Sequence, residues 1–346
     1  MKDRHASSGP ATGSASFMLP FSFAAAGILS VRPLMAIRII KEGIFTSLQG
    51  GPRFGRQSFG FNPGGSMDRG ALRILNTLLG NDPDALAIEI HYPPGKYLFD
   101  DETDFALGGA DFSAVLNGTS IRNWKIVRAA GGSELSFRRK AAGNRCYLAV
   151  RGGFIGNGTG GRETLSGQTV RAISGDVFHT HPAALPNGPA AGIVAPSLRP
   201  NYASRPTVRV IPCGEFEQLS DESKDRFLGS EFELTSESDR MGFRLKGPEL
   251  RRTTSDEIVS AAVTFGTIQL LPSGQLIMLM ADHQTSGGYP RIATVISADL
   301  PVAAQLGPGD RISFRVTDNA AAELAALEFD RELRKLSIAA SFGKFW

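Results

Sequence analysis

The sequence predicts a mainly β protein of two domains with a few short helices. Its 346 residues are about twice the length of a common domain. Forty glycines and twenty prolines indicate many turns and short connections. Apolar residues make up 42% and charged residues 21%, which is typical of a folded globular chain. We therefore expect each half to bury its own core.

Short runs rich in β-branched and aromatic residues recur between clusters of Gly, Pro, Asn and Asp, and they predict strands. In the first half these runs are residues 36–40, 86–91, 124–129, 133–137 and 145–150. In the second half they are residues 207–211, 231–235, 261–265, 267–271, 276–280, 292–296 and 311–316.

Three segments depart from the strand pattern and predict helices. In MDRGALRILNTLLGN the apolar residues fall at helical spacing, with Asp68 suited to cap the start and Gly80 the end. A second helix is expected over 220–228, with Ser220 as its cap. The alanine-rich stretch after Val316 predicts a carboxy-terminal helix, which either docks through a stripe of leucines or is a loosely attached tail. The stripe would consist of Leu324, Leu327 and Leu333.

The proline-rich segment 187–206 is the best candidate for a domain boundary. We expect one β domain over 35–195, a second over 205–317 and a helical tail over 318–346. Residues 1–34 are rich in Ser, Gly and Ala and are expected to be a disordered extension. A secretory signal is the alternative for this segment, although a proline interrupts its short apolar core.

Several classes of function are excluded or disfavoured. The formal net charge is +3, with no long basic block, so nucleic acid is not an expected partner, and no apolar run is long enough to span a bilayer. The motifs GxxxxGK[ST], GxSxG, HExxH and paired CxxC are absent. His179 and His181 could supply two metal ligands, but no third lies nearby in sequence, so no metal site is expected.

The densest polar and glycine-rich block is ADHQTSGGYPRIATVISADLP, residues 281–301. Side-chain donors and acceptors here stand beside two glycines that let backbone amides approach a ligand closely, a pattern suited to binding an anion or an amide. A tight strand-to-strand turn is the alternative. The substrate-binding candidates in this block are Gln284, Thr285, Gly287, Gly288, Tyr289 and Arg291.

This block resembles the ADxQTxGGYPxIATVI signature of the KipA-like family, whose members are also known as allophanate hydrolase subunit 2 or as the C subunit of 5-oxoprolinase. Blocks at 64–81, 144–154, 236–248 and 304–314 agree, so the similarity spans roughly 36–316. The chain departs from the family between Gln49 and Asp68, where Gly50 replaces the usual Asp and Gly64 the usual Ser.

The resemblance implies two cyclophilin-like β-barrel domains and a cytoplasmic subunit of an ATP-dependent 5-oxoprolinase. The partner would be a KipI-like subunit, with a lactam-utilisation subunit as a further one. ATP, with Mg, would bind on a partner or be shared with one, and biotin would act only through a separate carrier. Two alternatives remain: a regulatory antagonist of a KipI-like kinase inhibitor, and a carboxyltransferase-type component of a urea amidolyase-like enzyme.

Opening a lactam needs anion stabilisation and a proton acceptor. Arg240 and Arg291 could clamp a carboxylate or phosphate through a bidentate fork. Asp239, Asp282 and His283 are the expected proton-transfer residues, although Asp239 and Arg240 could equally form a structural ion pair.

Weaker candidates lie in the first half. Arg53 could bind substrate, and Glu89 could face either solvent or the domain interior. Asp111 follows two glycines and is expected in a turn, and Trp124 is expected in the core.

Overall fold

A computed structural model describes residues 35–156, 169–186 and 192–341. The expected extension over 1–34 lies outside the described residues. All described residues belong to one compact unit, Leu34–Trp346. Within it, the strands of residues 36–179 form two sheets, and seven of the strands of residues 207–316 form a closed barrel.

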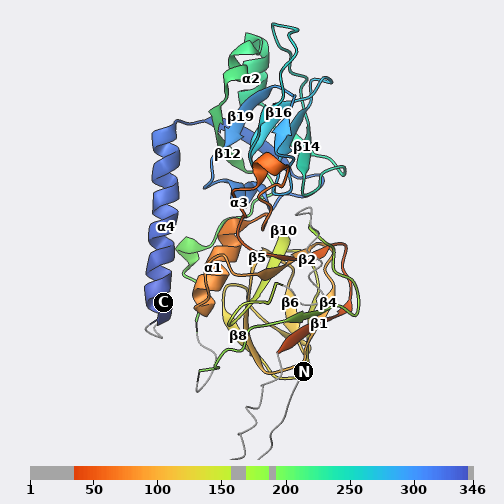
Figure 1. The fold of residues 1–346 in the computed structure, drawn as a ribbon, viewed down its shortest axis with the longest axis vertical. Helices are drawn as coiled ribbons and strands as arrows, with labels where there is room; N and C mark the ends of the chain where they lie inside the picture. Colours follow the sequence, from red (N-terminus) through yellow and green to blue (C-terminus); the bar gives the residue numbers. More distant parts are fainter. Residues whose placement is uncertain (1–34, 157–168, 187–191, 342–346) are drawn as a thin grey trace, which may run out of the picture. The chain divides into compact units, whose positions relative to one another are not determined.

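The first half consists of a six-stranded and a five-stranded antiparallel sheet (Figure 1). The six-stranded sheet has the order β11 (Val177–His179), β1 (Ala36–Lys41), β4 (Lys96–Phe99), β9 (Ser133–Phe137), β6 (Ala114–Leu116) and β7 (Thr119–Ser120). The five-stranded sheet has the order β2 (Thr46–Gln49), β3 (Ala87–His91), β10 (Ala142–Val150), β5 (Thr103–Asp111) and β8 (Ile126–Ala129). Inward-facing residues of both sheets share one core, in which Ile37, Tyr97, Phe99 and Phe105 are fully buried.

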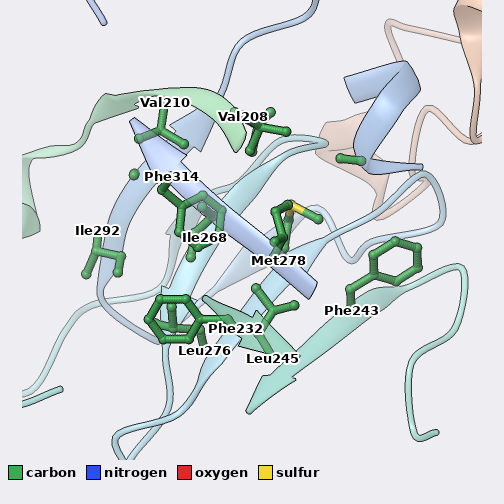
Figure 2. Close-up of a cluster of buried hydrophobic side chains, with 14 of the residues drawn as sticks. Val208, Val210, Phe232, Phe243, Leu245, Ile268, Leu276, Met278, Ile292 and Phe314 are labelled. Carbon is green, nitrogen blue, oxygen red and sulfur yellow. The ribbon is translucent and has the colours of Figure 1, made fainter. Parts of the chain in front are cut away.

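The second half is a closed barrel of seven strands. Its order is β12 (Thr207–Pro212), β19 (Arg291–Val295), β16 (Thr267–Leu270), β17 (Leu276–Leu279), β14 (Gly242–Lys246), β13 (Phe232–Leu234) and β20 (Arg311–Val316). A parallel β12–β20 ladder closes it, so each barrel strand is paired on both sides. Figure 2 shows side chains from opposite strands, among them Val208, Ile268, Met278 and Phe314, meeting in the interior.

Two short strands, β15 (Ala261–Ala262) and β18 (Ser286–Gly287), pair outside the barrel. Of the predicted run 261–265, only the first two residues are a strand. Short 3-10 helices occupy Gln57–Phe59, Pro196–Leu198 and Gly214–Gln218.

The predicted helices are confirmed. Helix α1 (Arg69–Leu79) starts at Asp68, whose Oδ1 accepts the amide of Ala71 at 2.8 Å, and ends at Gly80, whose φ of +74° is the left-handed conformation glycine adopts at no steric cost. Helix α2 (Asp221–Gly229) is capped by Ser220. A four-residue helix, α3 (Leu300–Ala303), follows β19.

Helix α4 (Asn319–Ser341) is the longest element (Figure 1). Its buried residues are Leu333, Leu336 and Ala339, and the two leucines belong to the core cluster that contains α1. Leu324 and Leu327 are 58% and 54% exposed, so only Leu333 of the expected stripe packs against the fold. Among the described residues no helix combines the length and the apolar character that a membrane crossing requires.

Candidate functional site

A cavity of about 710 Å³ lies where loops of the barrel meet the first half of the chain. From the barrel half it is lined by Ser236, Ser238, Asp239, Arg240, Met241, Asp282, His283, Gln284, Gly307 and Pro308. From the first half it is lined by Ile44, Phe45, Gly60, Asn62, His91, Tyr92, Asn144, Arg145 and Thr169. The cavity thus unites all three predicted proton-transfer residues with Arg240 and Gln284.

Arg240 occupies the centre of the polar network. Its guanidinium binds both carboxylate oxygens of Asp282, at 2.8 and 3.0 Å, and donates to Glu89 Oε1 at 2.5 Å. Nη2 also donates to the carbonyl of Gly65 at 2.7 Å. Gly65 has a φ of +88° and a Cβ there would lie 2.8 Å from the carbonyl oxygen of Gly50, so only glycine fits this position. Arg240 therefore pairs with Asp282 and Glu89, and not with its neighbour Asp239.

Glu89 lies in β3 with its side chain fully buried. Its Oε2 accepts from the amide of Met67 at 2.9 Å and from the hydroxyl of Tyr147 at 2.7 Å. Burial by itself raises the pKa of Glu89, but the Arg240 guanidinium and the bond to His91 outweigh burial and hold the pKa well below its ordinary value. Glu89 thus faces the interior as an ionised carboxylate.

The two cavity histidines present unprotonated ring nitrogens. His283 Nδ1 lies 2.6 Å from the carbonyl oxygen of Gln284, which can only accept, so Nδ1 carries the proton and Nε2 is the basic atom. His91 Nε2 lies 2.8 Å from the ionised Glu89, so its Nδ1 is basic by the same reasoning. Burial lowers the pKa of both rings, that of His91 to about 4, so both are neutral at pH 7.

Asp239 stands on the turn before β14. Its Oδ1 accepts the amides of Met241 at 2.8 Å and Gly242 at 3.1 Å, which fixes the carboxylate. Oδ2 makes no hydrogen bond to the described residues. Both oxygens of Asp282 are bound to Arg240. Of these two carboxylates, Asp239 is therefore the one with an oxygen available to a ligand.

The second part of the predicted 281–301 site lies elsewhere, so of the substrate-binding candidates in this block only Gln284 lines the cavity. Ser286 and Gly287 form β18, which pairs with β15. Thr285, Gly288 and Tyr289 do not line the cavity, and Tyr289 is 42% exposed. Gln284 is the last residue of this block that lines the cavity, and the chain enters β18 two residues later.

Arg291 is also outside the cavity. It begins β19 and its Nη2 donates to Glu215 at 2.7 Å, so it neutralises a carboxylate on the 3-10 helix Gly214–Gln218. Of the two arginines predicted to clamp an anion, only Arg240 lines the cavity. Arg291 fixes the 3-10 helix to the barrel instead.

Of the weaker candidates in the first half, some lie near the cavity and others lie away from it. A Cβ placed on Gly64 would lie 3.9 Å from both Arg53 Nη2 and Asp282 Oδ1, which puts Arg53 beside the cavity. Asp111 ends β5 and its Oδ1 accepts the amide of Ser113 at 2.7 Å, a turn contact away from the cavity. Trp124 is 7% exposed in the core, as expected.

Sequence reasoning missed His91, Asn144 and Arg145, which the first half contributes to the cavity. It also missed Gln305, whose side chain hydrogen-bonds to Asp68 and to the backbone of Arg145. Arg145 begins the predicted strand 145–150, and an arginine leading into an apolar strand was the available signal. Among the described residues no group of three His, Cys, Asp or Glu side chains is arranged to hold a metal ion.

The family model for "Carboxyltransferase domain, subdomain A and B" matches residues 59–316. The chain belongs to this carboxyltransferase family. It is 36% identical over 293 residues to the C subunit of 5-oxoprolinase from Escherichia coli (strain K12), covering 80% of this chain and 90% of that one. It is 35% identical over 269 residues to the C subunit of 5-oxoprolinase from Haemophilus influenzae, covering 76% and 85%.

The fold of this carboxyltransferase-family chain is also similar to a solved structure. It superposes on the crystal structure of the urea amidolyase of K. lactis with a TM-score of 0.78 and 26% identity, over 88% of this chain and 20% of that one. The chain thus corresponds to one portion of that larger enzyme.

Proposed function

We propose that this protein is a subunit of an ATP-dependent 5-oxoprolinase, which opens 5-oxo-L-proline to L-glutamate in the cytoplasm together with a KipI-like subunit and a lactam-utilisation subunit. The observation that carries the proposal is the cavity lined by Asp239, Arg240, Asp282 and His283, in a chain that matches 90% of the length of a 5-oxoprolinase C subunit. Hydrolysis of ATP would supply the driving force for opening an unstrained amide.

The side chains of the cavity suit proton transfer to and from an amide. Neutral His283 with a basic Nε2 is a proton acceptor for water, and Asp239 Oδ2 is a second acceptor. Arg240 does not release a proton: burial opposes its charge, but Glu89 and Asp282 outweigh burial and hold its pKa above the ordinary value. In this proposal Arg240 and Asp282 position the loop that carries His283, and His283 and Asp239 act on the substrate.

The cavity fits a small amide better than it fits Mg-ATP. Both oxygens of Asp282 are bound to Arg240, which leaves one oxygen of Asp239 as the available carboxylate ligand. We therefore assign ATP to a partner subunit.

A carboxyltransferase role is the second candidate, supported by the family description and by the similarity to urea amidolyase. In that case a biotin group on a separate carrier would deliver the carboxyl group, and the amide substrate would occupy the same cavity. The two roles differ in their co-reactant: the first needs ATP and no biotin carrier.

The test is reconstitution. The full chain is mixed with its KipI-like and lactam-utilisation partners, assembly is verified by size-exclusion chromatography, and glutamate and ADP are measured with 5-oxo-L-proline. We expect glutamate release that needs all components, and loss of at least about a hundredfold in turnover for His283→Ala with assembly intact. His181→Ala, on an exposed loop, is the matched control and should retain turnover.

An assembled complex that releases no glutamate would contradict the proposal. If the same complex instead suppresses a kinase inhibitor, and His283→Ala leaves that effect unchanged, the chain is a regulatory antagonist.

A further inference from the structure

Arg145 differs from Arg240 in lacking a carboxylate partner. It lies in β10 and is 6% exposed, yet it forms no salt bridge within the described ranges 35–156, 169–186 and 192–341. A buried guanidinium without an anion is costly, because a buried charge is ordinarily paired. Arg145 also lines the cavity.

The guanidinium of Arg145 is held in place by the barrel half. Nη1 donates to the carbonyl oxygens of Ala304 at 2.6 Å and Leu306 at 3.0 Å, and Cζ lies 5.1 Å from the ring centroid of Phe243. Carbonyls and a ring face orient the group without neutralising it as a carboxylate would. The orientation of the guanidinium is therefore fixed before a ligand binds.

Two nitrogens of Arg145 have no hydrogen-bond partner among the residues that the structure describes. Nε is buried and unpartnered, and the side-chain hydrogen bonds of Arg145 to those residues all come from Nη1, which leaves Nη2 unused. Arg69, Arg73 and Arg291 also have an unpartnered Nε, but none of the three lines the cavity. Nε and Nη2 form the edge of a guanidinium that binds a carboxylate through two parallel hydrogen bonds.

Electrostatics agrees with this geometry. Burial lowers the pKa of Arg145, and the carboxylate of Glu89, which favours the charge, does not compensate for that loss of hydration. Glu89 is already bound to Arg240, His91 and Tyr147. An anion hydrogen-bonded to Nε and Nη2 would stabilise the positive charge of Arg145, which burial disfavours.

A second residue of the cavity, Asn62, offers an acceptor without a partner. Asn62 lines the same cavity, and its Nδ2 donates to the carbonyl of Asp282 at 3.0 Å. This contact fixes the amide orientation and leaves Oδ1 buried without a partner. Oδ1 can accept only from a donor such as an amide N–H.

We propose that Arg145 is the carboxylate anchor of the cavity and selects small amides that carry a carboxylate, with Asn62 Oδ1 accepting the amide N–H. This inference rests on the proposed function and adds the residue that distinguishes an acidic lactam from a neutral one.

The test compares two ligands that differ only in the carboxylate. Binding of 5-oxo-L-proline and of 2-pyrrolidinone to the full chain, alone and in the assembled complex, is measured by calorimetry. We expect wild type to prefer 5-oxo-L-proline by about ten- to a hundredfold, and Arg145→Gln to lose that preference while binding 2-pyrrolidinone unchanged. Arg38→Gln, an exposed arginine of the same half paired with Asp100, is the matched control and should keep the preference.

Equal binding of the two ligands by wild type, or an undiminished preference in a folded Arg145→Gln protein, would overturn the inference. If Arg145→Gln does not fold, Arg145→Lys replaces it: it keeps the charge, loses the fork, and should reduce the preference several-fold.

The two proposals can fail separately. Preference for the carboxylate through Arg145 without glutamate release in the assembled complex removes the proposed function and leaves the anchor. Glutamate release by Arg145→Gln with an unchanged KM for 5-oxo-L-proline removes the anchor and leaves the function.

Discussion

Arg240 Nη1 lies 2.5 Å from Glu89 Oε1, although the two residues are 151 positions apart in the chain. The pair joins the loop before β14 to β3, and its side chains are 7% and 0% exposed. It is therefore a bond between the two halves of the molecule, formed directly beneath the cavity.

Removing one partner of this pair should destabilise the fold. We expect Glu89→Gln to lower the free energy of unfolding by about 3 kcal/mol, because it leaves the buried Arg240 with one carboxylate in place of two. In Glu89→Gln/Arg240→Met the two losses should not add. Urea denaturation monitored by circular dichroism measures both.

An exposed pair is the control for this cycle. Lys96 and Glu134 are 47% and 41% exposed, and Glu134→Gln should cost less than about 1 kcal/mol. Strictly additive losses at Glu89 and Arg240 would show that the two side chains do not interact in solution.

The free energy of unfolding should depend on pH through the carboxyl group of Asp68. Burial raises its pKa to about 6, against hydrogen bonds from Ala71, Tyr202 and Gln305 that lower it. Because the folded state then binds the proton more tightly than the unfolded chain, the stabilisation is fully present below about pH 4 and is lost as the pH rises through about 6. We expect the stability difference between wild type and Asp68→Asn to be larger at about pH 4.5 than at about pH 7.5, by on the order of 2 kcal/mol.

Asparagine retains the helix cap, so this comparison isolates the proton. The low pKa of His91 changes stability with the opposite sign between about pH 6.5 and 4, but His91 is present in both proteins and cancels in the difference. A stability difference that stays constant across this range would contradict the raised pKa of Asp68.

Gln305 should be intolerant of truncation. Its Oε1 accepts the amides of Asn144 and Arg145 at 3.0 and 2.9 Å, and its Nε2 donates to Asp68 Oδ2 and to the carbonyl of Arg145, both at 2.8 Å. Gln305→Ala leaves these buried groups unsatisfied, and we expect a loss of about 2–4 kcal/mol in unfolding free energy.

The exposed Gln284 is its stability control, and Gln284→Ala should change the unfolding free energy by less than about 0.5 kcal/mol. Equal effects of the two truncations would mean that Gln305 does not connect the halves.

Helix α4 should be attached through its last turns. We expect Leu333→Ala to cost about 2 kcal/mol and to speed amide hydrogen exchange across α4, because Leu333 packs in the core cluster with α1. Leu324→Ala, at a 58% exposed position, should leave exchange unchanged. Faster exchange in both variants would indicate that the amino-terminal turns of α4 pack as well.

The local sequence determined most of the elements. Runs rich in β-branched and aromatic residues predicted strands such as 36–40 and 311–316, and caps at Asp68 and Ser220 predicted helix starts, because these signals act over a few residues. Strand β5 was missed because Gly108 and Gly109 indicate a turn. In the fold Gly109 has a φ of +74°, and a Cβ there would collide with the carbonyl oxygen of Arg145 on the neighbouring strand. That close approach is a tertiary requirement for glycine.

The sequence also identified the block that includes Asp282 and His283, and the family to which the chain belongs. It could not show that Arg240 pairs with Glu89, that Arg291 turns to Glu215, or that Arg145 has no anion partner among the described residues. Those facts depend on which strands become neighbours, since a charge far away along the chain is invisible to local spacing. The residue types for a site were thus set by the sequence, and the tertiary structure decided which charges are neutralised within the fold and which remain available to a ligand.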